Sequence, residues 1–176
     1  MLVRTGSDAD AAGATAVVRQ VLLEHGLQFE PAGLDADIVA PDRHFSGAGG
    51  AFYVAVENGR IVGTAALQVT GPARGEVRKL FLLPEARGRG VGRALLCAVL
   101  DAARTRGVQR LTLTTRVRYQ RAIRMYEKAG FRLAGTARKP RGGDLGLSFE
   151  LDLAARSVPE RPAGLPRRHL TPAVAA

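Results

Sequence analysis

The sequence lacks the features that mark disulfide-linked, membrane-spanning and secreted proteins. It contains one cysteine, Cys97, which excludes an internal disulfide and a cysteine-rich zinc site. No apolar run reaches the ~18 residues that a membrane-spanning helix needs. Residues 1–4 lead directly into polar residues, without the charged and then apolar pattern of a signal peptide. These absences predict a cytoplasmic protein with no membrane partner.

Lysine is also scarce, because only three of the 26 lysines and arginines are lysine. The formal net charge is nevertheless +10, which is compatible with a nucleic acid, an acidic substrate or a polyanionic cofactor. The arginines are spread along the chain, and no helix-turn-helix or zinc-finger pattern accompanies them. A nucleic-acid-binding protein therefore stays the weaker alternative, and a steep salt dependence of binding would reveal it.

The length and composition suit one folded domain. The chain has 176 residues, and 46% of them are apolar, so a sizeable core can form. We expect this domain to cover residues 1–153. Residues 154–176 hold four prolines and several arginines without periodicity, which predicts a disordered tail. The three histidines are far apart and have no metal-ligand spacing, so we expect no metal.

Local patterns predict the order of helices and strands. Ser7 with an acid three residues later is typical of a helix start, and Asn58-Gly59 is a strong signal for a two-residue hairpin turn. The segment 27–50 is expected to be a loop with a short helix near 34–40. The order is β-α-(α)-βββ-α-β-α-ββ, which indicates an α/β domain with a mixed sheet. The expected strands are 2–4, 51–57, 60–69, 76–83, 108–115, 131–137 and 145–153, and the expected main helices are 7–25, 90–106 and 119–129.

The most informative segment is a strand that ends at Pro84, followed by a glycine-rich turn and a helix. Gly88, Gly90 and Gly92 would let backbone amides approach a ligand, and a helix N-terminus adds free N–H donors with a positive partial charge. Such a turn suits a pyrophosphate. The Gly-x-Gly-x-Gly spacing fits neither the P-loop nor the dinucleotide fingerprint, and a glycine-rich helix entry without a ligand is the alternative.

Two motifs in the correct order resemble the GNAT superfamily of N-acetyltransferases. Residues 87–92 are similar to its Arg/Gln-x-x-Gly-x-Gly/Ala motif, and residues 122–131 are similar to its Ala-x-x-Leu-Tyr-Glu-Lys-x-Gly-Phe signature. The resemblance covers about residues 2–153. It implies a splayed central sheet flanked by helices, with acetyl-coenzyme A as cosubstrate lodged in the gap and a primary amine as acceptor.

The resemblance also implies the site residues. The family often places a tyrosine near the coenzyme sulfur and a glutamate on the central strand, which makes Tyr126 the candidate acid and Glu76 the candidate base. A core tyrosine and a surface or ion-paired glutamate are the alternatives. Tyr119 stands where many members have asparagine, so it receives no role. The expected coenzyme-binding residues are Leu80, Phe81, Leu82, Arg87, Gly88, Arg89, Gly90, Val91, Gly92 and Arg93.

No sequence pattern identifies the acceptor amine. A small molecule or a protein amine is possible, and a homodimer is plausible from the resemblance. A protein that senses acetyl-coenzyme A without catalysis is the first alternative to an enzyme. Asp35 and Asp37 lie in the early loop, where they would line the acceptor entrance or serve as helix caps or solvated acids. Cys97 follows two leucines in a helix and is expected to be buried.

Overall fold

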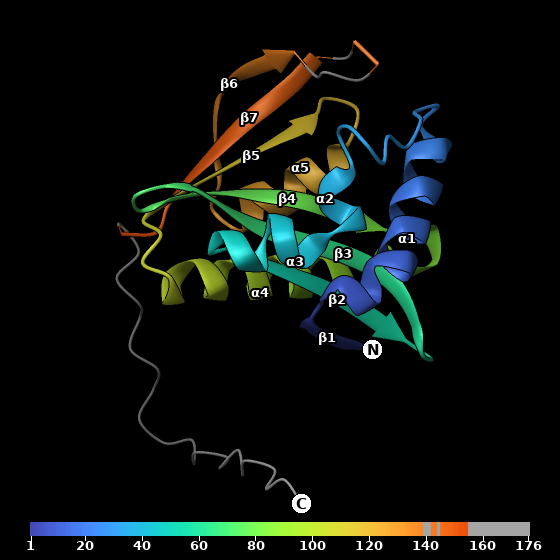
Figure 1. Ribbon diagram of the computed structural model, residues 1–176. Helices are drawn as coiled ribbons and strands as arrows, with labels where there is room; N and C mark the ends of the chain where they lie inside the picture. The colour runs from blue at the N-terminus through green and yellow to red at the C-terminus, as the bar shows by residue number, and fades with distance from the viewer. Residues whose placement is uncertain (139–141, 144, 155–176) are drawn as a thin grey trace, which may run out of the picture.

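The computed structural model describes residues 1–138, 142–143 and 145–154 (Figure 1). In these residues the strands form one mixed sheet in the order β1-β2-β3-β4-β5-β7-β6. The predicted α/β class with a helix-flanked sheet is therefore confirmed. The predicted tail lies outside the described residues except for Ala154. None of the helices in the described ranges has both the length and the apolar character needed to cross a bilayer.

The observed elements follow the predicted order. The helices and short 3-10 turns are η1 (Asp8–Asp10), α1 (Ala11–Glu24), α2 (Ala36–Val39), α3 (Pro41–His44), η2 (Ser46–Ala48), η3 (Pro84–Ala86), α4 (Val91–Thr105) and α5 (Gln120–Lys128). The strands are β1 (Leu2–Thr5), β2 (Ala51–Glu57), β3 (Arg60–Gly71), β4 (Arg74–Leu82), β5 (Arg110–Arg116), β6 (Arg132–Arg138) and β7 (Leu145–Asp152). The early loop is thus more helical than expected, because α3 and η2 follow the predicted short helix.

Helix α1 begins as the sequence predicts. Ser7 is the N-cap of the 3-10 turn that leads into α1, and its backbone amide donates to Asp10 Oδ2 at 3.1 Å. Arg4 of β1 pairs with the same carboxylate at 2.7 Å and holds the pKa of Asp10 below its usual value. This contact fixes the start of α1 against the edge strand.

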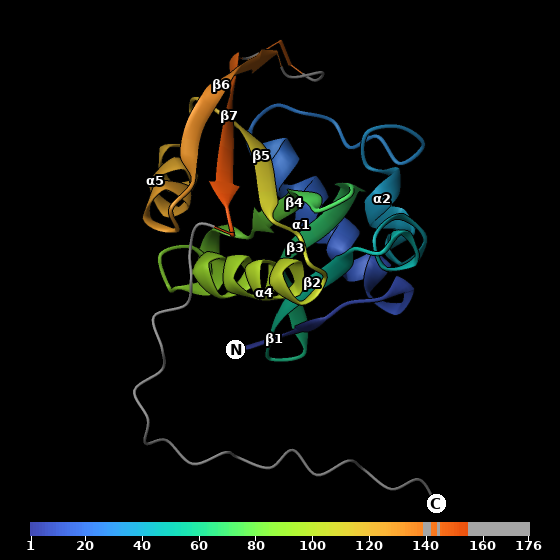
Figure 2. The ribbon, with the colours of Figure 1, turned by 90° about the vertical axis from the view of Figure 1, so that its left-hand side faces the viewer.

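The helices cover the two faces of the sheet. Helix α4 packs on one face through a stripe of buried apolar residues, while α1, α2 and α3 cover the other face (Figures 1 and 2). Burying a leucine or valine side chain contributes about 1.5–3 kcal/mol, so this stripe fixes α4 firmly. Its members are Leu95, Leu96, Val99, Leu100 and Ala103. Cys97 lies off this stripe and is exposed, so the expectation that it is buried was wrong.

The sheet opens between β4 and β5, which are its adjacent parallel strands. Their pairing covers only the first three residues of β4, from Arg74 opposite Arg110 to Glu76 opposite Thr112. Beyond this point β5 continues with β7 as its partner, whereas residues 77–82 of β4 pair only with β3. Figure 1 shows β5 and β7 diverging from β4. The sheet is therefore splayed, and Glu76 lies where the two strands separate.

Strand β4 also contains a bulge. The register with β3 is regular from Gly75 to Arg78 and shifts before Phe81, and Lys79 within the shift has a φ of +51°. A positive φ is uncommon for a residue with a side chain. The Lys79 carbonyl accepts a hydrogen bond from Thr64 Oγ1 of β3 at 2.7 Å, which stabilises the irregular backbone. The bulge bends β4 beside the gap.

Candidate active site

The glycine-rich turn lies between η3 and α4 and is open. Gly88 and Gly90 have φ values of +75° and +83°, and a Cβ added at either position would meet no atom within 4 Å. The first hydrogen bond of α4 is donated by the Ala94 amide to the Gly90 carbonyl at 3.0 Å. The preceding amides have no acceptor within the helix, and the helix dipole adds positive potential there. The turn can therefore bind an anion with backbone groups.

Gly92 has a different role from the other two glycines. A Cβ at this position would lie 2.9 Å from Leu82 Cδ1 and 3.3 Å from Met125 Sδ. Gly92 thus allows α4 to begin in close contact with the end of β4 and with α5. This close packing brings the turn, the end of β4 and α5 together at the open end of the sheet.

The three arginines of the turn differ in their contacts. Arg87 pairs with Glu24 of α1 at 2.8 Å, and Arg89 pairs with Glu57 of β2 at 2.6 Å, which raises the pKa of Arg89 and lowers that of Glu57. Arg93 is exposed on the first turn of α4. Neither of these two acidic partners has a signature in the sequence. Carboxylates thus partly offset the charges of Arg87 and Arg89. The remaining positive potential of the turn comes from its backbone amides and from Arg93.

The end of β4 presents backbone groups to the gap. The Leu83 amide bonds to Val62 of β3 at 3.0 Å, so strand alternation directs the backbone groups of Phe81 toward β3 and those of Leu80 and Leu82 toward the gap. Arg87 Nη2 already donates to the Leu82 carbonyl at 2.9 Å. All three predicted residues are half-buried. Of the three, Leu80 and Leu82 can meet an extended ligand in the gap.

Tyr126 lies in α5 on the far side of the turn. Its side chain is buried, with 6% of its surface exposed, and its ring packs against Phe131 and Phe149 at centroid distances of 6.0 and 6.5 Å. Burial raises the pKa of the Tyr126 phenol above its ordinary value. The ring of Tyr126 thus packs in the core, and its phenol stays neutral over the physiological pH range.

Tyr119 is at the N-cap position of α5 and packs locally. Its ring lies 4.7 Å from the ring of His25, and the Arg118 guanidinium lies over it at 5.7 Å. Partial burial, and then the charge of Arg118, lower the pKa of His25, so this histidine is neutral at pH 7. The contact joins the end of α1 to the loop between β5 and α5.

Glu76 is half-buried at the point where β4 and β5 separate. It is opposite Gln68 of β3 and Thr112 of β5, so their side chains share the face covered by α1 and α2. Within the described ranges no hydrogen bond or ion pair engages the Glu76 carboxylate. Glu76 can therefore accept a proton or hold a water in the gap.

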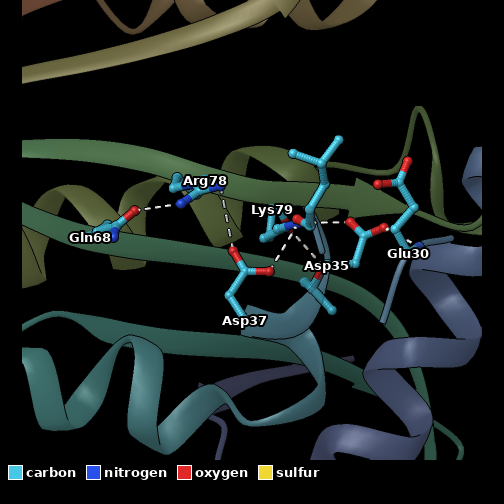
Figure 3. Close-up of polar contacts among 8 residues, drawn as sticks. Glu30, Asp35, Asp37, Gln68, Arg78 and Lys79 are labelled. Atoms are coloured by element: carbon cyan, nitrogen blue, oxygen red, sulfur yellow. Dashed lines mark hydrogen bonds and ion pairs between the residues drawn. The ribbon is translucent and has the colours of Figure 1, made fainter. Parts of the chain in front are cut away.

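Buried charges lie on the same face, and sequence reasoning missed their arrangement. Lys79 Nζ lies 2.8 Å from Asp35 Oδ1 and 3.0 Å from Asp37 Oδ1, and it also donates to the Leu34 carbonyl at 2.7 Å (Figure 3). The Lys79, Asp35 and Asp37 side chains are only 8%, 3% and 8% exposed. Both aspartates are therefore buried ion-pair partners rather than solvated residues at an entrance. The sequence signal for a buried ion pair was a lysine within an apolar strand.

Arg78 connects this cluster to β3. Its Nη1 donates to Gln68 Oε1 at 2.6 Å, and its Nη2 lies 3.6 Å from Asp37 Oδ2 (Figure 3). The Arg78 side chain is 34% exposed, in contrast to the buried Lys79. Asp37 accepts no hydrogen bond of good geometry, although both cations lie beside it. Arg78 is therefore held from two sides and still faces open space.

Known proteins share this sequence pattern. The chain matches the sequence profile of the acetyltransferase (GNAT) family over residues 19–131. The uncharacterized N-acetyltransferase YjgM of Escherichia coli is 32% identical over 120 residues, which are 65% of this chain and 72% of that protein. The IAA acetyltransferase of Azospirillum brasilense is 41% identical over 81 residues, 46% of this chain. That match spans about half the length of the Azospirillum protein, at 53%.

Solved structures share the fold. An acetyltransferase of the GNAT family from Staphylococcus aureus Mu50 has a TM-score of 0.76 at 18% identity, over 86% of this chain and 98% of that chain. The yncA protein of Salmonella typhimurium, described as a putative acetyltransferase with its cofactor acetyl-CoA, has a TM-score of 0.74 at 22% identity, over 91% and 98% of the two chains. The sequence profile, the N-acetyltransferase relatives and the splayed sheet agree, and the chain belongs to the GNAT acetyltransferase family.

Proposed function

We propose that this protein transfers an acetyl group from acetyl-coenzyme A to a primary amine by direct attack in a ternary complex. The observation that carries the proposal is the gap between β4 and β5 beside an open, glycine-rich helix start. A diphosphate at the helix N-terminus and an amide-bearing arm along the free edge of β4 would each meet the backbone groups they need. The acetyl-CoA-bound relative from Salmonella has the same fold, which supports this cosubstrate.

The cosubstrate is assigned to two backbone segments. The amides from Gly88 to Arg93 bind the pyrophosphate, with Arg93 as an additional cation. The backbone groups of Leu80 and Leu82 bind the pantetheine arm. The hydrogen bond from Arg87 to the Leu82 carbonyl breaks when the arm binds. The acetyl group then lies near the point where the strands separate, beside Glu76.

The chemical step requires a neutral amine. A lysine-type ammonium has a pKa of ~10.4, so its deprotonation at pH 7 costs roughly 4–5 kcal/mol. Glu76, unpaired within the described residues, takes this proton directly or through a water. The amine nitrogen then attacks the thioester carbonyl, the C–S bond breaks, and the sulfur leaves as a thiolate. Tyr126, whose buried phenol is neutral at every physiological pH, donates its phenolic proton to that sulfur, and the proton that the attacking nitrogen loses as the amide forms restores the phenol.

A thermal-shift titration tests the cosubstrate site. Acetyl-coenzyme A at 100 times its Kd stabilises a protein by about 2.7 kcal/mol. In a Gly90→Glu variant the carboxylate repels the pyrophosphate, so this stabilisation should be lost. Gly59→Glu is the matched control, because Gly59 has a φ of +75° and open surroundings in the β2–β3 turn. An undiminished shift in Gly90→Glu would place the coenzyme elsewhere.

Release of coenzyme A with a panel of primary amines tests the catalytic part. Release that depends on an amine distinguishes an enzyme from a protein that only senses acetyl-coenzyme A. Clear binding without amine-dependent release from any member of a broad panel would favour the sensor.

A further inference from the structure

The acceptor side of the gap combines a free carboxylate with a held guanidinium. Glu76 and Arg78 are two residues apart in the regular part of β4, so their side chains lie on one face about 7 Å apart at the backbone. This is the face covered by α1 and α2, opposite the face that packs on α4. An acceptor that reaches the thioester from this face meets both groups.

The contacts of Arg78 hold its guanidinium in place and leave some of its N–H donors unused. Gln68 accepts from Nη1 at 2.6 Å, and Asp37 lies 3.6 Å from Nη2. A guanidinium has five N–H donors in a planar fork that matches a carboxylate. These two contacts leave some of the N–H donors of Arg78 unused, and its side chain is 34% exposed. Arg78 can therefore bind one more anionic group.

The buried charges behind Arg78 act as its support. Lys79 neutralises Asp35 and part of Asp37, and Asp35 also accepts from the Glu30 amide at 2.9 Å (Figure 3). Asp37 is thereby held in place beside Arg78, although it is too buried to meet a ligand itself. With Lys79 the two aspartates keep one net negative charge, which lies beside Arg78 and positions its guanidinium.

The opposite wall of the gap carries an arginine. In β5, Thr112 and Arg116 lie on the face of Glu76, because Thr112 is opposite Glu76 and Arg116 follows four residues later. Partial burial, and then the charge of Arg118, lower the pKa of nearby His25, while the charge of Glu24 opposes this shift. Arg116 therefore places a second guanidinium on the face of the sheet that carries Glu76 and Arg78.

We infer that the acceptor is an amine that carries a carboxylate close to the amino group, as an amino acid does, and that Arg78 binds this carboxylate while Glu76 meets the ammonium. The inference rests on the proposed acetyl transfer and names its acceptor class. The spacing of the two side chains on one strand suits a small zwitterion, whose ammonium and carboxylate are separated by one carbon. Arg78 is then a substrate-binding residue and Lys79 a positioning residue.

Matched acceptor pairs test this inference. Coenzyme A release is measured with a panel of L-amino acids, each beside its carboxamide, which has nearly the same size without the negative charge. The carboxamide has the less basic amine, with a pKa near the ~7.7–8.0 of a peptide α-amine, so amine reactivity alone would favour it. We expect kcat/KM to be about 10- to 100-fold higher for the best acid than for its carboxamide, as for a charge-assisted hydrogen bond.

Arg78→Met should remove that preference by raising KM for the acid, and Arg78→Lys should restore part of it. Arg104→Met is the control, because Arg104 pairs with Asp101 on an exposed turn of α4. The acetyl-coenzyme A thermal shift should be unchanged in all three variants. Amine acetylation that shows no preference for the acid, or a preference that survives in Arg78→Met, would overturn the inference and leave the transfer reaction standing.

Binding is measured separately, so that failure of the reaction does not hide the result. Calorimetric titration of the coenzyme A complex with the same acids and carboxamides reports recognition without turnover. Acid binding that is lost in Arg78→Met supports the inference even if no acetyl transfer occurs, and in that case only the proposed reaction falls. Equal binding of acid and carboxamide, or none of either, overturns the inference.

Discussion

Replacing Lys79 by methionine should destabilise the fold far more than a typical lysine substitution. The variant keeps a side chain of similar length but removes the ammonium that lies 2.8 Å from Asp35 and 3.0 Å from Asp37. Two buried carboxylates would then lose their shared ammonium, while Arg78 at 3.6 Å from Asp37 and the Glu30 amide beside Asp35 would remain. Removing one partner of a buried ion pair costs about 3–5 kcal/mol, which is a large part of a typical total stability of about 5–15 kcal/mol.

Thermal and urea unfolding measure this loss. For a domain of this size 1 kcal/mol corresponds to a change in Tm of about 2–4 °C, so the expected decrease is roughly 6–20 °C. Lys128→Met is the matched control, because Lys128 is exposed at the end of α5. Its Tm should change by little, as is usual for exposed charges.

A further variant tests whether uncompensated negative charge causes the loss of stability in Lys79→Met. Adding Asp35→Asn and Asp37→Asn to Lys79→Met removes the uncompensated charges, so this triple variant should recover more than half of the lost stability. A decrease below about 1 kcal/mol in Lys79→Met, or a triple variant no more stable than the single one, would refute the view that these charges depend on Lys79.

Further substitutions test the catalytic assignments. Tyr126→Phe keeps the ring packing against Phe131 and Phe149 and should lower kcat about 10²–10³-fold with a small change in Tm, measured at saturating substrates. Because burial raises the pKa of Tyr126 above its unfolded value of about 10, its neutral form stabilises the fold below pH 10 and this contribution is lost at higher pH. Alkaline urea titrations should therefore show a shallower loss of stability in Tyr126→Phe. Glu76→Gln should lower kcat/KM about 10²-fold at pH 7, with a smaller deficit above the pKa of the amine, in a pH–rate profile.

Local signals account for the parts of the fold that the sequence predicts well. The Asn58-Gly59 turn has φ values of +50° and +75°, as its residue types favour, and the hairpin follows from it. The spacing of leucines and valines predicts α4, and the glycines predict the open turn before it. Each of these features depends on residues within one element or one turn.

Contacts between distant residues account for what the sequence could not show. Arg87 meets Glu24 at a separation of 63 residues, and Arg89 meets Glu57 at 32, so the charge of the turn is partly offset by partners with no local signature. Lys79 meets Asp35 at a separation of 44. A positive φ at a lysine has no sequence pattern of its own, because glycine or asparagine is the usual occupant. The role proposed for Arg78 could therefore not be suggested before its neighbours were known.

The bulge in β4 places both halves of the proposed reaction on one short segment. After Lys79, Leu80 and Leu82 direct their backbone groups toward the gap, where the thioester arm is expected, and Arg78 before it keeps its side chain on the acceptor face. The positive φ at Lys79 costs of order 1–3 kcal/mol and persists because Thr64 and the two aspartates hold the residue from both sides. Lys79 joins β4 to the segment that contains Asp35 and Asp37. In the proposed complex, the distance between acceptor and thioester therefore depends on packed charges rather than on a loop. A rigid connection of this kind favours the close alignment of two reactants that direct attack requires.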